Sequence, residues 1–116
     1  MKNLKRYPND TIPWTNGTGS KVNSGDVVEI KSGNDGMVAI AETDIADGET
    51  GSVRIDGAVR NIAKKTGQSW SQGDKLYWDS SAGKLTTNAS SYTYAGRADA
   101  DAASADTVGD LMINQP

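Results

Sequence analysis

The sequence predicts an all-β protein, a small β-barrel or β-sandwich of short antiparallel strands with an extended N-terminal arm. Short runs of alternating apolar and polar residues recur along the chain, and turn-forming Gly, Asn and Asp residues separate them. The chain has 13 glycines, which fall between these runs as turn punctuation. Many short strands divided by frequent turns are typical of β-sandwiches and barrels.

The length and the apolar content limit the size of the core. At 116 residues the chain is expected to hold an arm and loose segment over residues 1–24 and a single β-domain over residues 25–116. It has 4 Leu, 7 Ile, 7 Val and no Phe, which together make 18 large aliphatic or Phe residues. So thin a core often gains stability from partners, and we therefore expect an oligomer or docking on a larger structure.

The first half of the chain reads as an arm followed by paired strands. Pro8 and Pro13 argue against a regular central strand near the N-terminus. Hairpin partners are expected at 27–31 and 37–42, around the turn at 34–36. Two further strands are expected at 52–55 and 58–64, joined by a hairpin turn at Asp56-Gly57.

The second half is organised around Gln72-Gly73-Asp74-Lys75-Leu76-Tyr77-Trp78-Asp79. A Gly-Asp turn opens this run and a Ser/Gly turn closes it, so it predicts a strand at 75–79 that enters a hairpin with 84–87. Further strands are expected at 92–97 and 108–114. The Ala- and Asp-rich stretch at 98–106 is expected to be a surface loop, with a short helix as the alternative.

Alternation along the strand at 75–79 separates its side chains. Leu76 and Trp78 share one face and are expected in the core, where aromatic rings must fill volume in a chain without Phe. Tyr77 points to the opposite face, and we expect it to contact another subunit or the larger structure on which the protein docks.

The two halves of the sequence contain similar features in the same order. Each runs from a Gly-Asp strand through a turn, a strand and an Ala/Asp loop to another strand, beginning at Gly25-Asp26 and at Gly73-Asp74. This order predicts two similar β-units. The alternative is that the similarity arises because short β-proteins use the same few turn sequences many times.

The composition argues against several classes of function. Without Cys or His the chain lacks the common thiol, imidazole and zinc chemistries, and we predict no catalytic residues, no cofactor and no metal site. Two acidic groups, Asp44/Asp47/Glu49 and Asp99/Asp101/Asp106/Asp110, are expected to be solvated loops, with a hard-cation site as the alternative. A sequence pI near 4.8 disfavours nucleic acid, and no apolar run predicts a secretory signal or a membrane span.

The N-terminal arm carries the most distinctive charge pattern. Lys2, Lys5 and Arg6 supply three of the twelve cations. The arm is expected either to be a solvated terminus or to reach onto an acidic partner surface, with Leu4 and Tyr7 as apolar anchors.

Several stretches in this order resemble the capsid cement, or head decoration, proteins of tailed bacteriophages. The resemblance covers roughly residues 22–113, and it is carried by these stretches: Ser24-Gly25-Asp26-Val27-Val28, Gly36-Met37-Val38-Ala39-Ile40-Ala41, Asp56-Gly57-Ala58-Val59, Gly73-Asp74-Lys75-Leu76-Tyr77-Trp78-Asp79, Gly83-Lys84-Leu85-Thr86 and Ala95-Gly96-Arg97-Ala98.

The resemblance implies a non-enzymatic protein on the outer surface of a phage head. Such proteins typically form trimers that bridge capsomers of the major capsid protein and stabilise the shell. The chain would be synthesised in the cytoplasm of the bacterial host, with Lys2, Leu4, Lys5, Arg6 and Tyr7 as capsid contacts. The alternative function is a phage tail or fibre β-domain that binds host glycans on its tyrosines. A carboxylate-dependent glycosidase is a more distant one.

Overall fold

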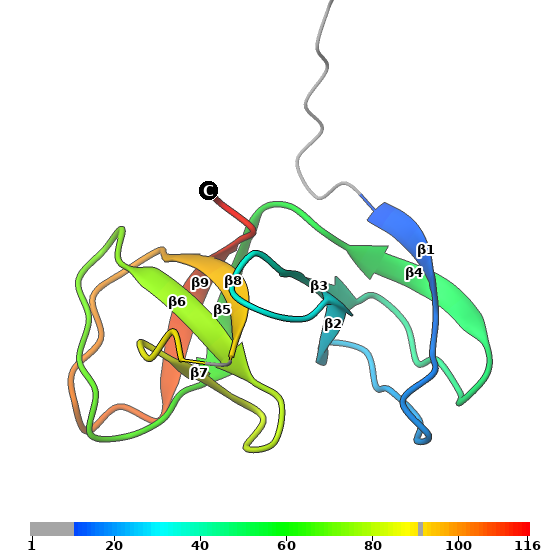
Figure 1. The fold of residues 1–116 in the computed structure, drawn as a ribbon, viewed down its shortest axis with the longest axis horizontal. Coiled ribbons are helices and arrows are strands. Elements are labelled where there is room, and N and C mark those ends of the chain that lie inside the picture. Colours follow the sequence, from blue (N-terminus) through cyan, green and yellow to red (C-terminus); the bar gives the residue numbers. More distant parts are fainter. Residues whose placement is uncertain (1–10, 91) are drawn as a thin grey trace, which may run out of the picture.

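The computed structural model describes residues 11–90 and 92–116, which form two antiparallel sheets and no helix (Figure 1). The first sheet has the spatial order β1-β4-β3-β2, from β1 (Thr11–Thr15), β2 (Val27–Lys31), β3 (Met37–Ala41) and β4 (Thr50–Arg54). The second has the order β5-β9-β8-β6-β7, from β5 (Ala58–Ala63), β6 (Lys75–Asp79), β7 (Lys84–Thr86), β8 (Thr93–Ala98) and β9 (Val108–Ile113). The all-β prediction is confirmed.

Two of the predicted hairpins are present. β2 pairs with β3, and β6 pairs with β7, each antiparallel. The segment 98–106 contains no helix, and Ala102 forms an isolated bridge with Trp70 there. The expectation of a loop is therefore confirmed over the helical alternative.

The segment expected to be loose contains a strand. β1 pairs along its whole length with β4, from Thr11 opposite Arg54 to Thr15 opposite Thr50. Pro13 is tolerated because β1 lies at the edge of the first sheet, where a missing backbone N–H on the outer side costs no ladder bond. Residues 11–15 are therefore not loose, but they form an edge strand and not the central strand against which the prolines argue.

The prediction of a hairpin at Asp56-Gly57 is also wrong. β4 lies between β1 and β3, while β5 pairs with β9 in the other sheet. Gly57 adopts a left-handed backbone conformation with φ of 96°, which the Asp-Gly sequence favours. The turn is local, but it passes the chain from one sheet to the next instead of folding β5 back on β4.

The two sheets are built on one plan, so the predicted repeat is present. Without β7, the second sheet has the same strand order as the first, with β5, β6, β8 and β9 in the places of β1, β2, β3 and β4. Each unit also has an isolated antiparallel bridge ahead of its Gly-Asp strand, Val22 to Ile45 in one and Trp70 to Ala102 in the other. We call these the first unit and the second unit.

Backbone hydrogen bonds repeat in the same places. In the first unit Gly25 N donates to Ala41 O and Ala41 N to Asp26 O, at 2.7 and 2.9 Å. In the second unit Gly73 N donates to Ala98 O and Ala98 N to Asp74 O, both at 2.8 Å. This correspondence pairs β2 with β6 at a fixed offset, so that Val28 matches Leu76 and Ile30 matches Trp78.

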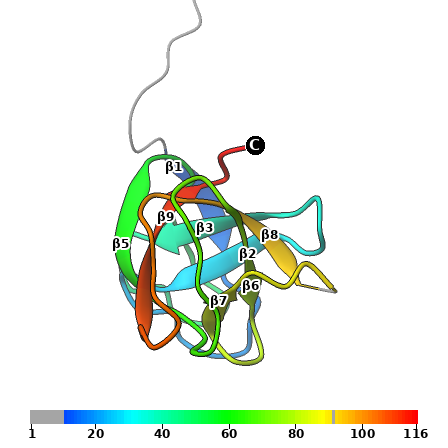
Figure 2. The same cartoon turned by 90° about the vertical axis from the view of Figure 1, so that its left-hand side faces the viewer.

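The second unit has one strand more than the first. β7 pairs with β6 and meets the end of β5 through a parallel bridge between Leu85 and Lys64. Seen from that end of the molecule, the five strands curve into a nearly closed barrel (Figure 2). In the first unit no described strand takes the place of β7, so β2 is left as an edge.

Two apolar cores meet at β3. Val38 and Ile40 point into the larger core with Leu76 and Trp78, whereas Ala39 and Ala41 point into the smaller one. These four side chains are at least 93% buried, because the strand has a core on each face. Leu76 and Trp78 lie in the core as predicted, at 0% and 8% exposure.

Asn114 joins the two units where β4 ends. Its Oδ1 accepts a hydrogen bond from Val38 N at 3.0 Å, and its Nδ2 donates to Val38 O at 2.8 Å and to Ile55 O at 3.0 Å. These Val38 groups are open because the last β3–β4 pair in this direction is Ile40 with Arg54. The φ of 56° at Asn114 is one that Asn tolerates better than most residues.

Asn114→Ala is expected to lower the free energy of unfolding by about 2–4 kcal/mol, because it leaves two carbonyls and one N–H without their partner. Chemical denaturation measures the change. Asn114→Gly should cost a similar amount, since Gly keeps the left-handed backbone but also lacks the side chain. Gln115→Ala is the control and should change stability by less than about 0.5 kcal/mol. An equally small effect of Asn114→Ala would contradict the assigned role.

Candidate interaction surfaces

The first acidic group caps its own loops. Asp44 and Asp47 lie between β3 and β4, and Glu49 lies just before β4. Each carboxylate accepts a hydrogen bond from a backbone amide: Asp44 from Ser24, Asp47 from Gly19 and Glu49 from Ala46, at 2.9 to 3.0 Å. The Ser24 amide, with help from Lys21, lowers the pKa of Asp44. These bonds favour the loop interpretation over a cation site.

The second acidic group is used in the same way. Backbone amides donate to Asp101 from Gln72, to Asp106 from Ala103 and to Asp110 from Asn61, at 2.7 to 3.0 Å. Within residues 11–90 and 92–116 no three acidic side chains converge in a geometry that would hold a metal ion. The carboxylates fix loop shape at both ends of the repeat.

Lys64 is a buried cation that sequence reasoning missed, because it reads as one half of a basic pair at a strand end. It is 1% exposed, and its Nζ donates to the carbonyls of Lys65, Gln68 and Asp106. Nζ also lies 5.0 Å from the centre of the Trp70 ring. Because the Lys64 ammonium group donates to carbonyls from separate loops, it holds these loops together.

Asn16 does the corresponding work in the first unit. It is fully buried, and its Nδ2 donates to Ser20 O at 2.8 Å and to Ile45 O at 2.9 Å. The backbone amides also correspond, since Asn16 N bonds Glu49 O and Lys64 N bonds Thr107 O. Asn16 and Lys64 each follow directly after the first strand of their unit, and this equivalent position is what could have identified both residues from the sequence.

Lys65 and Asp79 form a largely buried ion pair. Nζ lies 2.7 Å from Asp79 Oδ2, the side chains are 25% and 8% exposed, and the Tyr92 ring centre is 4.7 Å from Nζ. The hydrogen bond from Lys65 lowers the pKa of Asp79, and the same bond raises the pKa of Lys65. The other Asp79 oxygen accepts the amides of Ser81 and Ala82, which shapes the β6–β7 turn.

Tyr77 lies on the outer face of β6, as its alternation with Leu76 and Trp78 predicts. Its ring packs edge-on against Tyr94, with centroids 5.5 Å apart and planes at 73°. The Tyr94 hydroxyl donates to Gln115 O, and burial raises the pKa of Tyr94. Tyr77, Tyr92 and Tyr94 therefore each contact another side chain of the chain, which disfavours a flat platform for glycan stacking.

The predicted arm contacts, Lys2, Leu4, Lys5, Arg6 and Tyr7, lie outside the described residues. Their assignment to a capsid remains a prediction. The first described strand, β1, begins at Thr11.

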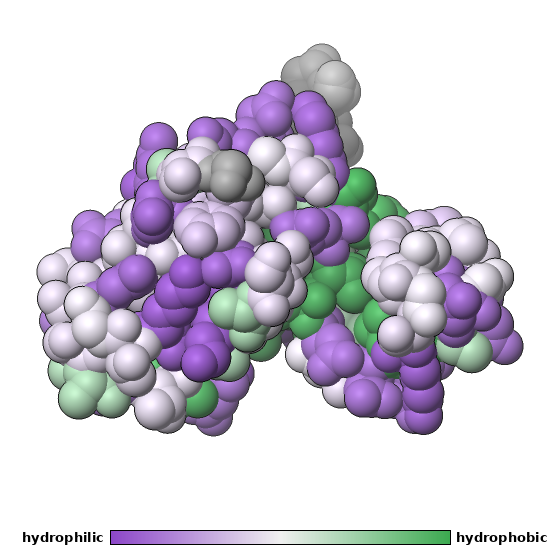
Figure 3. Space-filling model, turned by 60° about the horizontal axis from the view of Figure 1, so that its bottom comes forward, coloured by the Kyte–Doolittle hydropathy of each residue, from purple (hydrophilic) through white to green (hydrophobic). Residues whose placement is uncertain are grey.

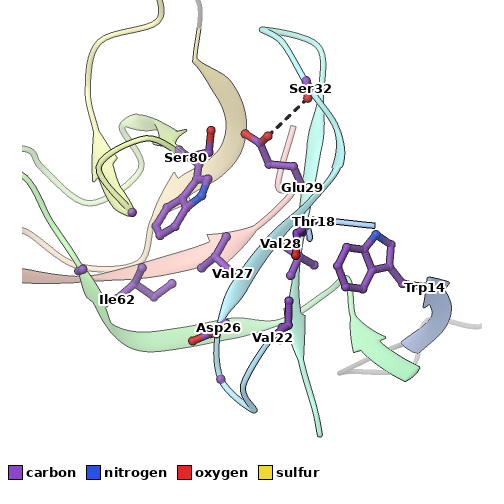
Figure 4. Close-up of a pocket in the computed structure, with 14 residues that line it drawn as sticks. Trp14, Thr18, Val22, Asp26, Val27, Val28, Glu29, Ser32, Ile62 and Ser80 are labelled. Carbon is purple, nitrogen blue, oxygen red and sulfur yellow. Dashed lines mark hydrogen bonds between the residues drawn. The ribbon is translucent and has the colours of Figure 1, made fainter. Parts of the chain in front are cut away.

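A groove between the two units has a volume of about 650 Å³. From below, it separates the two lobes, and hydrophobic side chains colour its floor (Figure 3). The edge strand β2 runs along it. Val27 points toward Ile62 of the second unit, whereas Val28 points toward Val22 and Trp14 of the first (Figure 4).

The rim of this interlobe groove is acidic. Asp26 and Glu29 line it beside Ser32, whose hydroxyl bonds Glu29 at 3.4 Å. An apolar floor with two carboxylates at the rim fits an extended segment that carries apolar and basic side chains. The sequence did not indicate this groove, because its walls come from both units. The one feature that could have indicated it is that the first unit has no described strand corresponding to β7.

Asp79→Asn is expected to lower the melting temperature at pH 7, because Asn keeps the turn hydrogen bonds but loses the charge paired with Lys65. The pair stabilises the fold fully above the unfolded pKa of about 4 and loses this effect as pH falls through the lower folded pKa. The difference from wild type should therefore shrink below about pH 4. Asp35→Asn, which removes an exposed pair with Lys31, is the control and should give a smaller difference at pH 7. Equal effects of the two variants, or a pH-independent difference, would contradict this account.

Comparison with known proteins places the chain in one family. The family model described as phage cement protein matches residues 7–113, nearly the whole chain. No curated protein and no solved structure gives a significant match. Within the described residues there is no helix long and apolar enough to cross a membrane.

Proposed function

This chain belongs to the phage cement protein family, and we propose on that basis that it binds the outer surface of a phage head and stabilises the shell. The family is structural and is located on the exterior of the capsid. We further propose that the partner is the major capsid protein of a tailed phage and that the protein acts without catalysis, after synthesis in the cytoplasm of the bacterial host.

The family match over residues 7–113 carries this proposal, and the geometry supports it. The buried cation Lys64 is bonded to carbonyls of its own loops, and the loop carboxylates of both units accept backbone amides. The hydrogen bonds of these groups stabilise the loops of the two small β-units. A rigid clamp, made of two units joined side by side, suits a protein whose task is mechanical.

We propose a homotrimer that bridges capsomers. The two cores are small, and a thin interior is commonly supplemented by subunit contacts. A trimer that grips three neighbouring positions gains strength by multivalency, because the second and third contacts form at high effective concentration. No single high-affinity pocket is then required.

We propose two regions of contact with the shell or with neighbouring subunits. The first is the basic arm, with Lys2, Lys5 and Arg6. The second is Tyr77, which stands half-buried on the outer face of β6. Tyr77→Ser should weaken binding to heads or loosen the oligomer, and no change in either would refute its role.

Purified protein mixed with undecorated heads of the cognate phage is expected to add density on the outside of the shell at three-fold and quasi-three-fold positions. Cryo-electron microscopy of the mixture measures this. Decorated heads should also resist heat or osmotic shock better than bare ones. Heads that stay bare at micromolar protein would overturn the proposal, and binding to a glycan array instead would support the tail or fibre alternative.

Changing Lys2, Lys5 and Arg6 together to Gln is expected to weaken binding to heads about tenfold at low salt, since each exposed ion pair contributes a few tenths to 1 kcal/mol. The wild-type affinity should fall with added salt more steeply than that of the variant, because salt screens surface charges. Co-sedimentation with heads measures both effects. Lys75→Gln with Lys84→Gln is the control, because both lysines are exposed on the second unit. An unchanged affinity in the arm variant would count against the arm.

A further inference from the structure

The repeat shows what is missing from the first unit. In the second unit β7 covers the outer edge of β6, and its Leu85 is fully buried opposite Trp78. The matching strand β2 has β3 on one side and no described strand on the other. The position opposite Ile30, which corresponds to that of Leu85, therefore has no strand of its own.

The interlobe groove lies at this open edge. It runs along Val27, Val28 and Glu29 of β2, and reaches Trp14 at the end of β1. Successive β2 side chains face opposite walls, one formed by the first unit and the other by the second (Figure 4). A strand added to β2 would likewise send alternate side chains to the two walls.

We propose that Leu4–Tyr7 of a second copy of this chain adds to the outer edge of β2 and fills the groove in place of the missing strand. Leu4 and Tyr7 are three residues apart, so an extended backbone turns them to opposite faces and gives each wall one apolar side chain. Lys5 and Arg6 between them complement the rim carboxylates of Asp26 and Glu29.

The chain itself supplies the template for this contact. β7 places one leucine, Leu85, beside a lysine, Lys84, and this strand seals the second unit. The segment Leu4-Lys5 presents the same two residue types. It precedes β1 in the chain, so donating it removes no strand from the two described sheets.

The direction of β1 selects a second copy as the recipient. β1 runs from Thr11 toward Trp14, and Trp14 lines the groove. A copy's own arm is joined to β1 at Thr11, at the opposite end of the strand from Trp14. This assigns Leu4 and Tyr7 to a neighbouring copy. Lys2 is then left for the shell, and Lys5 and Arg6 affect binding to heads through the oligomer that they help to hold.

Disulfide trapping tests the proposal in the full chain, which has no native cysteine. Leu4→Cys protein carrying a mass tag is mixed with untagged Ile30→Cys protein and oxidised mildly, since Ile30 faces the position that corresponds to Leu85. A tagged–untagged dimer is expected, because paired strands bring facing side chains within disulfide reach. The control mixture uses Ala103→Cys, which is exposed on a loop at the far end of the second unit, and should give at least tenfold less dimer.

The double variant, Leu4→Cys with Ile30→Cys in one chain, separates the alternatives. A bond within single chains at high dilution would overturn the proposal in favour of self-insertion. Equal dimer yields with Ile30→Cys and Ala103→Cys, or no dimer at all, would also overturn it. Leu4→Asp should raise the concentration at which the oligomer dissociates at least tenfold, whereas Leu4→Ile should not. These measurements need no phage heads, so their failure leaves the proposed binding to the shell untouched.

Discussion

The burial of β3 on both faces is the constraint on which the rest of the structure depends. Its alternating side chains serve two cores at once, so neither unit can shift relative to the other without exposing apolar surface. Asn114 fixes the same strand from the second unit through the open backbone groups of Val38. A protein assembled from two small repeats thereby behaves as one body, with the interlobe groove as the space that the junction leaves.

Local patterns in the sequence were sufficient for most of the fold. Alternation placed Leu76 and Trp78 inside and Tyr77 outside, and the Gly-Asp turns marked the starts of β2 and β6. Pairing partners were harder to predict, because they depend on which strand offers the better neighbour. Asp56-Gly57 has the chemistry of a hairpin turn, yet β4 was already paired on both sides, and β5 had to go elsewhere.

For the candidate surfaces, too, local features could be predicted from the sequence and contacts between distant segments could not. The capping carboxylates were visible in the sequence as acidic clusters, but four of the six backbone amides that they accept lie 20 to 49 residues away along the chain. Lys64 was not singled out from the sequence, because no residue pattern shows that the carbonyls of Lys65, Gln68 and Asp106 converge on its ammonium group. The groove could not be seen at all from one segment, since Trp14 and Ile62 reach it from different units.

The open edge of β2 also carries a hazard. An exposed strand edge invites any extended chain to pair with it, and head-to-tail pairing of identical copies grows into fibres unless the rotation between copies closes a ring. β2 has features that restrict such pairing, namely an irregular register between Glu29 and Lys31 and a charge at each of these positions. A ring of few members would satisfy every edge and stop growth, whereas an unclosed chain of copies would deplete the soluble pool before assembly.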